Sequence, residues 1–194
     1  MKLFSLKGFI HFSVGRFKTR YQVIPPSEDL YYNLDAVKVA DVLLIVHPID
    51  KTESYSLDNC SLLTCIYNHC LPTTMHVVVG LEYVSFKKRS QIKKEVQNAI
   101  EHKFPGEKVH KVDNSQELLN ILQLLSNCKK RKVNQRNHHS YILAEDVKYE
   151  SANRFLKVKG FVRNYPLDVN QLVHIPGWNN YQIESIQILN DPYA

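Results

Sequence analysis

Two short apolar runs, separated by a segment of helical periodicity, most strongly constrain the fold of this 194-residue chain. Val42–Val46 and Thr73–Val79 are rich in apolar and β-branched residues, as is typical of strands that are buried on both faces. Between these runs, and after the second one, apolar residues recur at helical spacing. Helix-length connections pair neighbouring strands in parallel, with right-handed crossovers. The sequence therefore predicts an α/β fold, with a doubly wound, mostly parallel sheet and helices on both of its faces.

The same pattern extends over most of the first 128 residues, in the order β-α-β-α-β-α-β-α. The strands are expected at Phe17–Ile24, Val42–Val46, Thr73–Val79 and Lys108–Val112. The helices are expected at Glu28–Val39, Leu57–Cys70, Ile92–Phe104 and Asn114–Leu125. Asn114 and Glu117 have the spacing of a capping box, which predicts that the last helix begins at this point.

The sequence changes character after residue 128. Residues 129–140 are basic and polar and are interpreted as a linker. Beyond them we find only strand signals, at Tyr141–Tyr149, Phe155–Arg163, Leu172–Ile175 and Tyr181–Leu189. This pattern predicts the start of an antiparallel β-barrel, and an incomplete one because four strands cannot close most barrels. The expected organisation is an α/β domain over 1–128, the linker over 129–140 and a partial barrel over 141–194.

The positive charge of the chain is concentrated in one segment. The net charge is +6, and the segment from Phe86 to Arg136 alone holds 13 Lys and Arg against 5 Asp and Glu. An excess of this kind favours an anionic partner, with nucleic acid ahead of a membrane because no basic helix with bulky aromatics is present. A solvated charged face on ordinary helices is an equally open alternative at this point.

Two basic clusters in this segment supply the candidate RNA contacts. The first opens a predicted helix, where positive charge opposes the helix dipole and destabilises the helix unless an anion is bound. The second follows another helix, where positive charge is favourable, and it also fits a nuclear-import signal. The candidates are Lys87, Lys88, Arg89, Lys93, Lys94, Lys129, Lys130, Arg131, Lys132 and Arg136.

The cysteines do not have the spacing of a metal site. Cys60, Cys65 and Cys70 are five residues apart on a predicted helix, so that neighbours in the series lie about 140° apart around its axis. With Cys128, and without a CxxC pair, they predict reduced thiols in an intracellular protein rather than a zinc site.

Membrane-inserted segments are also not expected. The longest purely apolar run, Val42–Val46, has five residues, against the roughly 20 that a membrane-spanning helix needs. Leu3–Val14 is apolar, but Lys7 and His11 interrupt it, and we do not expect it to be a signal peptide.

A sheet of this kind followed by a barrel is the layout of translational GTPases, yet their nucleotide-binding motifs are missing from the sequence. No GxxxxGK[ST] phosphate loop is present. Pro25-Pro26-Ser27 follows the first expected strand, where an Asp and a Gly would position water. Gly80-Leu81-Glu82-Tyr83 follows the third, where Asn-Lys-x-Asp would read guanine. Because doubly wound sheets bind ligands at the carboxyl ends of their strands, the sequence predicts no nucleotide, no Mg²⁺ and no other cofactor there.

Three further candidate sites have simpler interpretations. His47 and Asp50 follow a buried strand and could serve acid–base chemistry, but a loop histidine without a partner nucleophile is the favoured interpretation. His138 and His139 are interpreted as solvated side chains rather than metal ligands. Trp178 could stack on a base, but an aromatic side chain at a hairpin tip, packed on the barrel, is preferred. The sequence therefore predicts no catalytic residue and no metal site.

Several segments resemble one family of ribosome-biogenesis factors. Leu156–Arg163 (LKVKGFVR) and Leu167–Gly177 (LDVNQLVHIPG) are similar to the barrel segment of the Tsr/Bms family. Shorter similar segments, in the same order, are Leu34–Asp41, Cys70–Thr73, Lys103–Pro105, Tyr141–Glu145 and Asp191-Pro192. The resemblance covers roughly Arg16 to the end, and Met1–Gly15 matches nothing in the family that we can place.

Within that family the chain is most similar to the Tsr branch, whose nucleotide motifs are degenerate. The resemblance implies a GTPase-like sheet that lacks its first strand here, in a family whose members are several times longer. It further implies a non-catalytic factor that binds the pre-40S particle, through rRNA and ribosomal proteins, during rRNA maturation in the nucleus and nucleolus. Neither a membrane nor a small-molecule substrate is expected. The alternatives are an active GTPase of the Bms type, with its phosphate loop outside this chain, and a generic nucleic-acid-binding α/β module.

Overall fold

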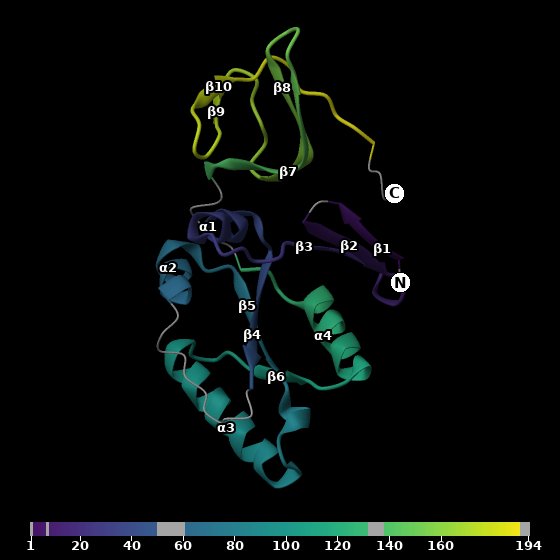
Figure 1. Cartoon of the computed structure of the whole chain (residues 1–194), viewed down its shortest axis with the longest axis vertical. Helices are drawn as coiled ribbons and strands as arrows, with labels where there is room; N and C mark the ends of the chain where they lie inside the picture. Colours follow the sequence, from purple (N-terminus) through teal and green to yellow (C-terminus); the bar gives the residue numbers. More distant parts are fainter. Residues whose placement is uncertain (1, 7, 50–60, 132–137, 191–194) are drawn as a thin grey trace. The chain divides into compact units, whose positions relative to one another are not determined.

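The chain forms two compact units in a computed structural model that describes residues 2–6, 8–49, 61–131 and 138–190. The first unit is Met1–Gln135 and the second is Arg136–Ala194. Figure 1 shows the helices and strands of each. Within the described ranges, none of the helices combines the length and the apolar character needed to cross a membrane.

The centre of the first unit is a three-stranded parallel sheet (Figure 1). Its strands are β4 (Val42–Pro48), β5 (Thr73–Val79) and β6 (Val109–Val112), in the order β4-β5-β6. The register pairs Val42 with Thr73 across β4 and β5, and His76 with Val109 across β5 and β6. The parallel pairing predicted from the helix-length connections is confirmed for these strands.

Helices cover both faces of this sheet. They are α1 (Leu30–Val39), α2 (Ser61–Cys70), α3 (Phe86–Lys103) and α4 (Ser115–Asn127). On one face, Val96 and Ile100 of α3 pack around Val78 of β5, whereas on the other face Ile121 of α4 packs against Val77. Successive residues of a strand point to opposite faces, so β5 supplies a side chain to each core. The predicted doubly wound arrangement is confirmed on these three strands.

One of the two edge strands of this sheet, β6, is bound near both of its ends by side chains of the flanking helices. The N–H of Val109 donates to Oε1 of Gln97 on α3 at 2.9 Å, and the N–H of Asp113 donates to Oε2 of Glu117 on α4 at 2.8 Å. The side-chain amide of Gln97 also donates to the carbonyl of Glu107 at 2.9 Å. Backbone groups that the sheet leaves without a partner strand are thereby satisfied.

The strand predicted at Phe17–Ile24 does not belong to the parallel sheet, so that part of the prediction is wrong. A separate antiparallel sheet contains β1 (Lys2–Leu6), β2 (Phe9–Val14) and β3 (Thr19–Val23), in that order. The cause is the short connection through η1 (Gly15–Phe17) and Lys18, which has a φ of 49° and turns β3 back along β2. The Tyr21 hydroxyl donates to the Leu122 carbonyl at 2.7 Å and ties this sheet to α4.

The second unit consists of antiparallel strand pairs. β7 (Ser140–Glu150) pairs with β8 (Phe155–Asn164), and β9 (Leu172–His174) pairs with β10 (Asn180–Gln182). The two pairs are separate sheets, and residues 138–190 contain no closed barrel. The predicted barrel start is therefore confirmed only as antiparallel strands. The strand predicted at Tyr181–Leu189 is limited to β10, because the residues after Gln182 have no partner strand within the described part of this unit.

Gly160 lies on β8, directly against the backbone of β7. It pairs with Ala144, next to an irregularity of the register between Ala144 and Asp146. A Cβ atom on Gly160 would lie 2.0 Å from the carbonyl oxygen of Leu143. Leu143 is the one buried apolar residue among those described in this unit. The hairpin therefore requires glycine at this position.

Candidate nucleic-acid interface

The turn after β5, where a guanine-reading loop would lie, is filled by the protein itself. Gly80 has a φ of 91°, and a Cβ atom there would lie 2.9 Å from the carbonyl oxygen of Ile49. The Ile49 N–H donates to the Val79 carbonyl at 3.0 Å. Leu81, which begins η2 (Leu81–Tyr83), is 2% exposed and lies in the core. This turn thus packs Gly80 against the backbone of Ile49 and Leu81 into the core, while Glu82 and Tyr83 are exposed.

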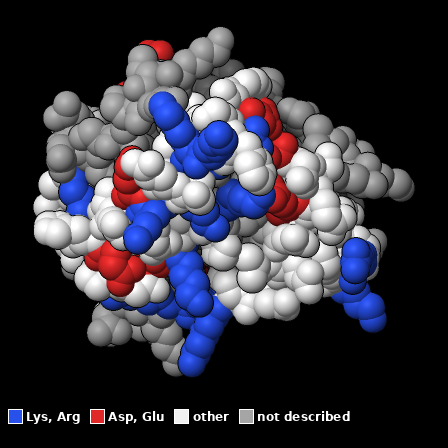
Figure 2. Space-filling model, turned by 90° about the horizontal axis from the view of Figure 1, so that it is seen from below, with Lys and Arg blue, Asp and Glu red and all other residues white. Residues whose placement is uncertain are grey.

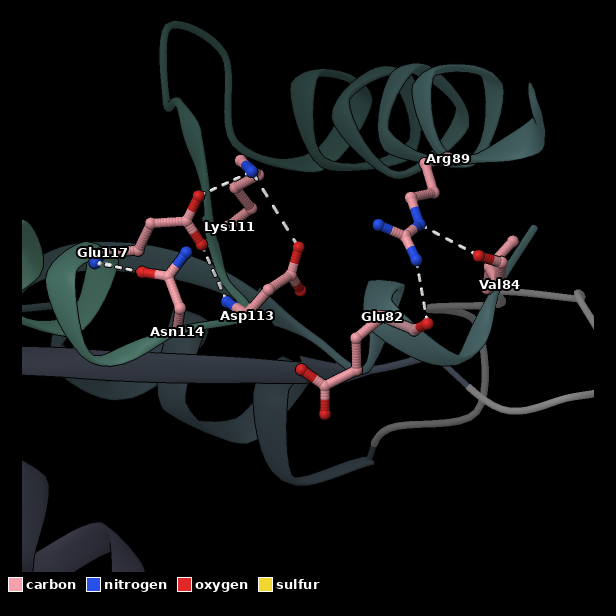
Figure 3. A network of polar contacts seen from close by, with 7 residues as sticks. All are labelled: Glu82, Val84, Arg89, Lys111, Asp113, Asn114 and Glu117. Atoms are coloured by element: carbon pink, nitrogen blue, oxygen red, sulfur yellow. Dashed lines mark hydrogen bonds and ion pairs between the residues drawn. The ribbon is translucent and has the colours of Figure 1, made fainter. Parts of the chain in front are cut away.

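Arg89 holds the same turn in place from α3 (Figure 3). Its Nε donates to the carbonyl of Val84 and its Nη2 to the carbonyl of Glu82, both at 2.9 Å. A guanidinium that bridges two carbonyls fixes η2 against the first turn of the helix. Among the candidate RNA contacts, Arg89 is therefore a residue with a structural role.

The end of β6 carries a second set of polar contacts (Figure 3). Oδ1 of Asn114 accepts from the Glu117 N–H at 2.9 Å, which confirms the predicted cap of α4. The Glu117 carboxylate reaches the N–H of Asp113, one residue before the cap, and pairs with Lys111 at 2.5 Å. The hydrogen bond from Lys111 is the main reason why the pKa of Glu117 lies below its usual value. Lys111 also lies 3.9 Å from Asp113.

The first basic cluster lies on α3 at the carboxyl end of the sheet. Lys87, Lys88 and Lys94 are exposed, whereas Lys93 is half-buried. The N-cap residue, Ser85, makes no side-chain hydrogen bond to the helix, and the first turn contains no acidic residue. Positive charge at this helix end is therefore not offset by a cap or a carboxylate of the turn. Figure 2 shows the molecule from below the view of Figure 1, and in the middle of the face seen there Lys and Arg side chains gather, with Asp and Glu side chains among them.

The second basic cluster lies at the opposite, amino end of β5. The N–H of Arg131 donates to Oγ1 of Thr73, the first residue of β5, at 2.6 Å. Lys130 pairs with Asp41 at 3.0 Å, and Lys129 is exposed. The two clusters therefore lie at opposite ends of β5, which has seven residues and is roughly 20 Å long. Lys132 and Arg136 lie outside the described residues.

The first unit contains a buried histidine pair that the sequence analysis missed. Nε2 of His47 lies 3.0 Å from Nδ1 of His76, the rings are stacked, and the side chains are 3% and 0% exposed. Burial lowers the pKa of both to about 4, so that both rings are neutral at pH 7. His47 lies within β4 rather than in a loop, which corrects the earlier interpretation. Asp50, its suggested partner in catalysis, lies outside the described residues.

The remaining candidates are placed as follows. Trp178 lies in the turn between β9 and β10, as predicted, but it is 77% exposed and is not packed against the strands. His139 makes an edge contact with Tyr141, with ring centroids 6.5 Å apart. Neither Cys65 nor Cys128 forms a disulfide, and burial raises the pKa of the Cys128 thiol. Among the described residues, no three His, Cys, Asp or Glu side chains converge on one point as metal ligands.

Comparison with protein families divides the chain into two matched regions. The family model described as the Tsr1 G-like domain matches residues 2–127, and the one described as the AARP2CN (NUC121) domain matches residues 129–192. The first match begins at residue 2, so the expectation that Met1–Gly15 has no counterpart is wrong. This segment forms β1 and β2 and completes an antiparallel sheet with β3.

Individual relatives carry the same description. The pre-rRNA-processing protein TSR1 homologue of Xenopus laevis is 33% identical over 195 residues, covering 97% of this chain and 24% of that protein. The human homologue is 31% identical over 85% of this chain and 21% of its own length. The homologue of Caenorhabditis elegans is 30% identical over 95% of this chain and 24% of its own length. The chain thus spans about a quarter of the length of these relatives.

The fold is similar to that of a translation factor. The bacterial selenocysteine-specific elongation factor EF-Sec aligns with a TM-score of 0.58 at 15% identity, over 88% of this chain and 30% of that one. At this level of identity the similarity is one of fold.

Proposed function

Because this chain belongs to the Tsr1 family of pre-rRNA-processing proteins, we propose that it serves ribosome biogenesis as a non-catalytic factor that binds the pre-40S particle. The observation that carries the proposal is the family match over residues 2–127. The partners are rRNA and ribosomal proteins, and the place of action is the nucleus and nucleolus. No small-molecule substrate, cofactor or membrane takes part.

The strand ends support a binding role rather than catalysis. At the ends of β5 and β6, the polar groups are hydrogen-bonded to one another, as in the contacts of Arg89 with Glu82 and of Lys111 with Glu117. A GTPase keeps these positions open for the nucleotide and its metal. A GTPase-like fold whose polar groups at these strand ends bind one another is suited to occupy a surface of the subunit sterically.

The exposed lysines on α3 are the RNA contacts that we propose first. Lys87 and Lys94 are seven residues apart, which is two turns of the helix, and therefore lie on the same side of α3. Lys87 lies in the first turn, whose charge is offset by neither a cap nor a carboxylate of that turn and where a phosphate would be stabilised by the helix dipole, and Lys94 extends the positive charge along the same side of the helix. Of the remaining candidates, Lys129 and Arg131 at the other end of β5 would reach a different part of the RNA.

Replacing both Lys87 and Lys94 by alanine is expected to weaken binding to structured fragments of small-subunit rRNA roughly tenfold or more at 0.1 M salt. Each lost phosphate contact should also make the slope of log affinity against log salt shallower, by about 0.7 where the contact is to a single-stranded part of the fragment. Fluorescence anisotropy at several salt concentrations measures both. Arg89 is left in place because its contacts with Glu82 and Val84 hold the turn.

The matched control replaces Lys157 and Lys159, which lie on β8 in the second unit, and so removes the same charge elsewhere. It is expected to retain the salt slope of the unmodified chain. Equal weakening by both double variants would reduce the proposal for α3 to a general effect of net charge.

Titration with a fluorescent GTP analogue and Mg²⁺ is expected to give no saturable signal. The reason is that the phosphate-loop and guanine-reading motifs are missing from the sequence and that the turn after β5 is bound to Arg89. Saturable micromolar binding that GTP but not ATP displaces would instead favour the active-GTPase alternative.

A further inference from the structure

A hollow of about 320 Å³ lies along β6 between α3 and α4. Its floor is apolar and consists of Val109 and Ile121, which are 6% and 4% exposed. Leu124 of α4 lines one side and is 42% exposed. An accessible apolar hollow of this size can accept one bulky side chain.

Two lysines, Lys93 and Lys111, give the rim of the hollow its positive charge, whereas the His110 ring beside them is neutral at pH 7 because its pKa is lowered. Lys93, His110 and Lys111 line it. Burial, followed by the charges of Lys93 and Lys108, lowers the pKa of His110, so these groups lie close enough to affect one another. Arg89 likewise acts on Lys111. Glu117 is the single acidic residue among those that line the hollow, and Lys111 already pairs with it.

We propose that this hollow binds an acidic, extended protein segment, which inserts one aromatic or large aliphatic side chain between α3 and α4. Carboxylates on either side of that residue pair with Lys93 and with Lys111 of β6. An apolar floor with a positive rim complements this chemistry, because the apolar side chain is buried while the charges remain at the surface.

The lining favours a peptide over an RNA base. No Phe, Tyr or Trp lines the hollow, so a base would lack the aromatic stacking that single-strand sites use. The segment would also not bind as an added strand, because the N–H groups of Val109 and Asp113 are already donated to Gln97 and Glu117. Recognition therefore depends on the side chain in the hollow and on its acidic neighbours.

The probe is a capped pentapeptide with a central phenylalanine and two acidic residues on each side, titrated into the whole ¹⁵N-labelled chain. Binding is expected to shift the backbone amide signals of His110, Lys111, Asn120 and Leu124. A second peptide with glycine in place of phenylalanine should bind at least about fivefold more weakly. A third, with glutamine in place of the acids, should weaken similarly.

Two pairs of variants localise the site. Lys93→Glu should weaken the peptide about tenfold, whereas Lys94→Glu makes the same charge change on a neighbour that does not line the hollow and should weaken it less than twofold. Leu124→Gln should weaken it about fivefold, whereas Leu118→Gln, at a residue that is 50% exposed outside the hollow, should not.

Three results would overturn the proposal. The first is equal weakening by Lys93→Glu and Lys94→Glu, which would indicate general charge attraction. The second is amide shifts confined to residues away from β6 and α4. The third is displacement of the peptide by a single-stranded RNA that shifts the same amides and loses affinity with Leu124→Gln, which would assign the hollow to RNA. None of these results depends on the rRNA contacts proposed for Lys87 and Lys94.

Discussion

Replacing Gly160 by alanine is expected to unfold the hairpin of β7 and β8 while the parallel sheet of the first unit remains folded. The added Cβ would lie 2.0 Å from the Leu143 carbonyl oxygen and 2.9 Å from Cα of Ala144, both of which belong to the backbone. A flexible side chain could move away, but here the strand itself would have to move, and the pairing at the register irregularity would be lost. We expect a loss of at least about 3 kcal/mol in the free energy of unfolding of this unit.

Amide hydrogen exchange separates the two units in the intact chain. Protection should be lost across β7 and β8 and retained in β4 and β5. Gly15→Ala is the matched control, because a Cβ atom there meets no atom within 4 Å and the residue does not have a positive φ. Its effect should remain within about 0.5 kcal/mol. A Gly160→Ala chain with unchanged protection of β7 and β8 would contradict this account of the hairpin.

Acid is expected to destabilise the first unit well above the pH at which its carboxylates titrate. Burial lowers the pKa of His47 and His76 to about 4 from an ordinary value of 6.5. The unfolded chain therefore binds more protons than the folded chain between these values, and stability falls as the pH falls through this window. The stability that these two histidines contribute is fully present above about pH 6.5 and reaches its lowest level near pH 4. Together the two histidines should contribute roughly 2–4 kcal/mol of the change between pH 7 and pH 5.

The geometry of the pair gives the physical reason. One ring nitrogen donates and the other accepts across the 3.0 Å contact, and Phe104 packs on the His76 ring. Protonation of both rings would place two donors and two positive charges face to face in the core. Two donors cannot share a hydrogen bond, and neither charge has water around it.

Urea unfolding at pH 7, 6 and 5 measures the effect. The double variant His47→Leu/His76→Leu removes both titrating groups, and its stability should depend much less on pH in this range. His110, whose pKa burial also lowers, contributes in the same direction and remains in both chains as a common background. An equally steep pH dependence in the double leucine variant would refute the assignment to this pair.

Local patterns predicted the elements whose partners lie nearby in sequence or follow from simple topology. The expected strand Thr73–Val79 has the observed bounds, and the Asn114 cap has the expected partner. Both depend on apolar runs and on residues three positions apart, which a sequence states directly. The strand near Phe17 was also found, but its neighbours depended on whether residues 2–14 form strands. That stretch contains charged and polar residues between its apolar ones, and it was not assigned to any element.

Contacts that depend on the register between strands far apart in the sequence could not be predicted from local patterns. The pairing of His47 with His76 requires that Ile45 lies opposite His76 across β4 and β5, which places both histidines on one face. Likewise, one basic segment of the sequence contains both basic clusters. In the structure, however, α4 returns the chain to the amino end of β5, where the second cluster lies. The candidate site therefore divided into two because of topology rather than composition.

The capped edge of β6 also bears on how this protein remains a separate molecule. A sheet edge with unused donors is a template on which a second molecule can add its own strand, and repeated addition leads to aggregation. Here Gln97 and Glu117 accept the donors of Val109 and Asp113, and Lys111 places a charge between them. This edge of the sheet therefore offers fewer free donors to a strand of a second copy.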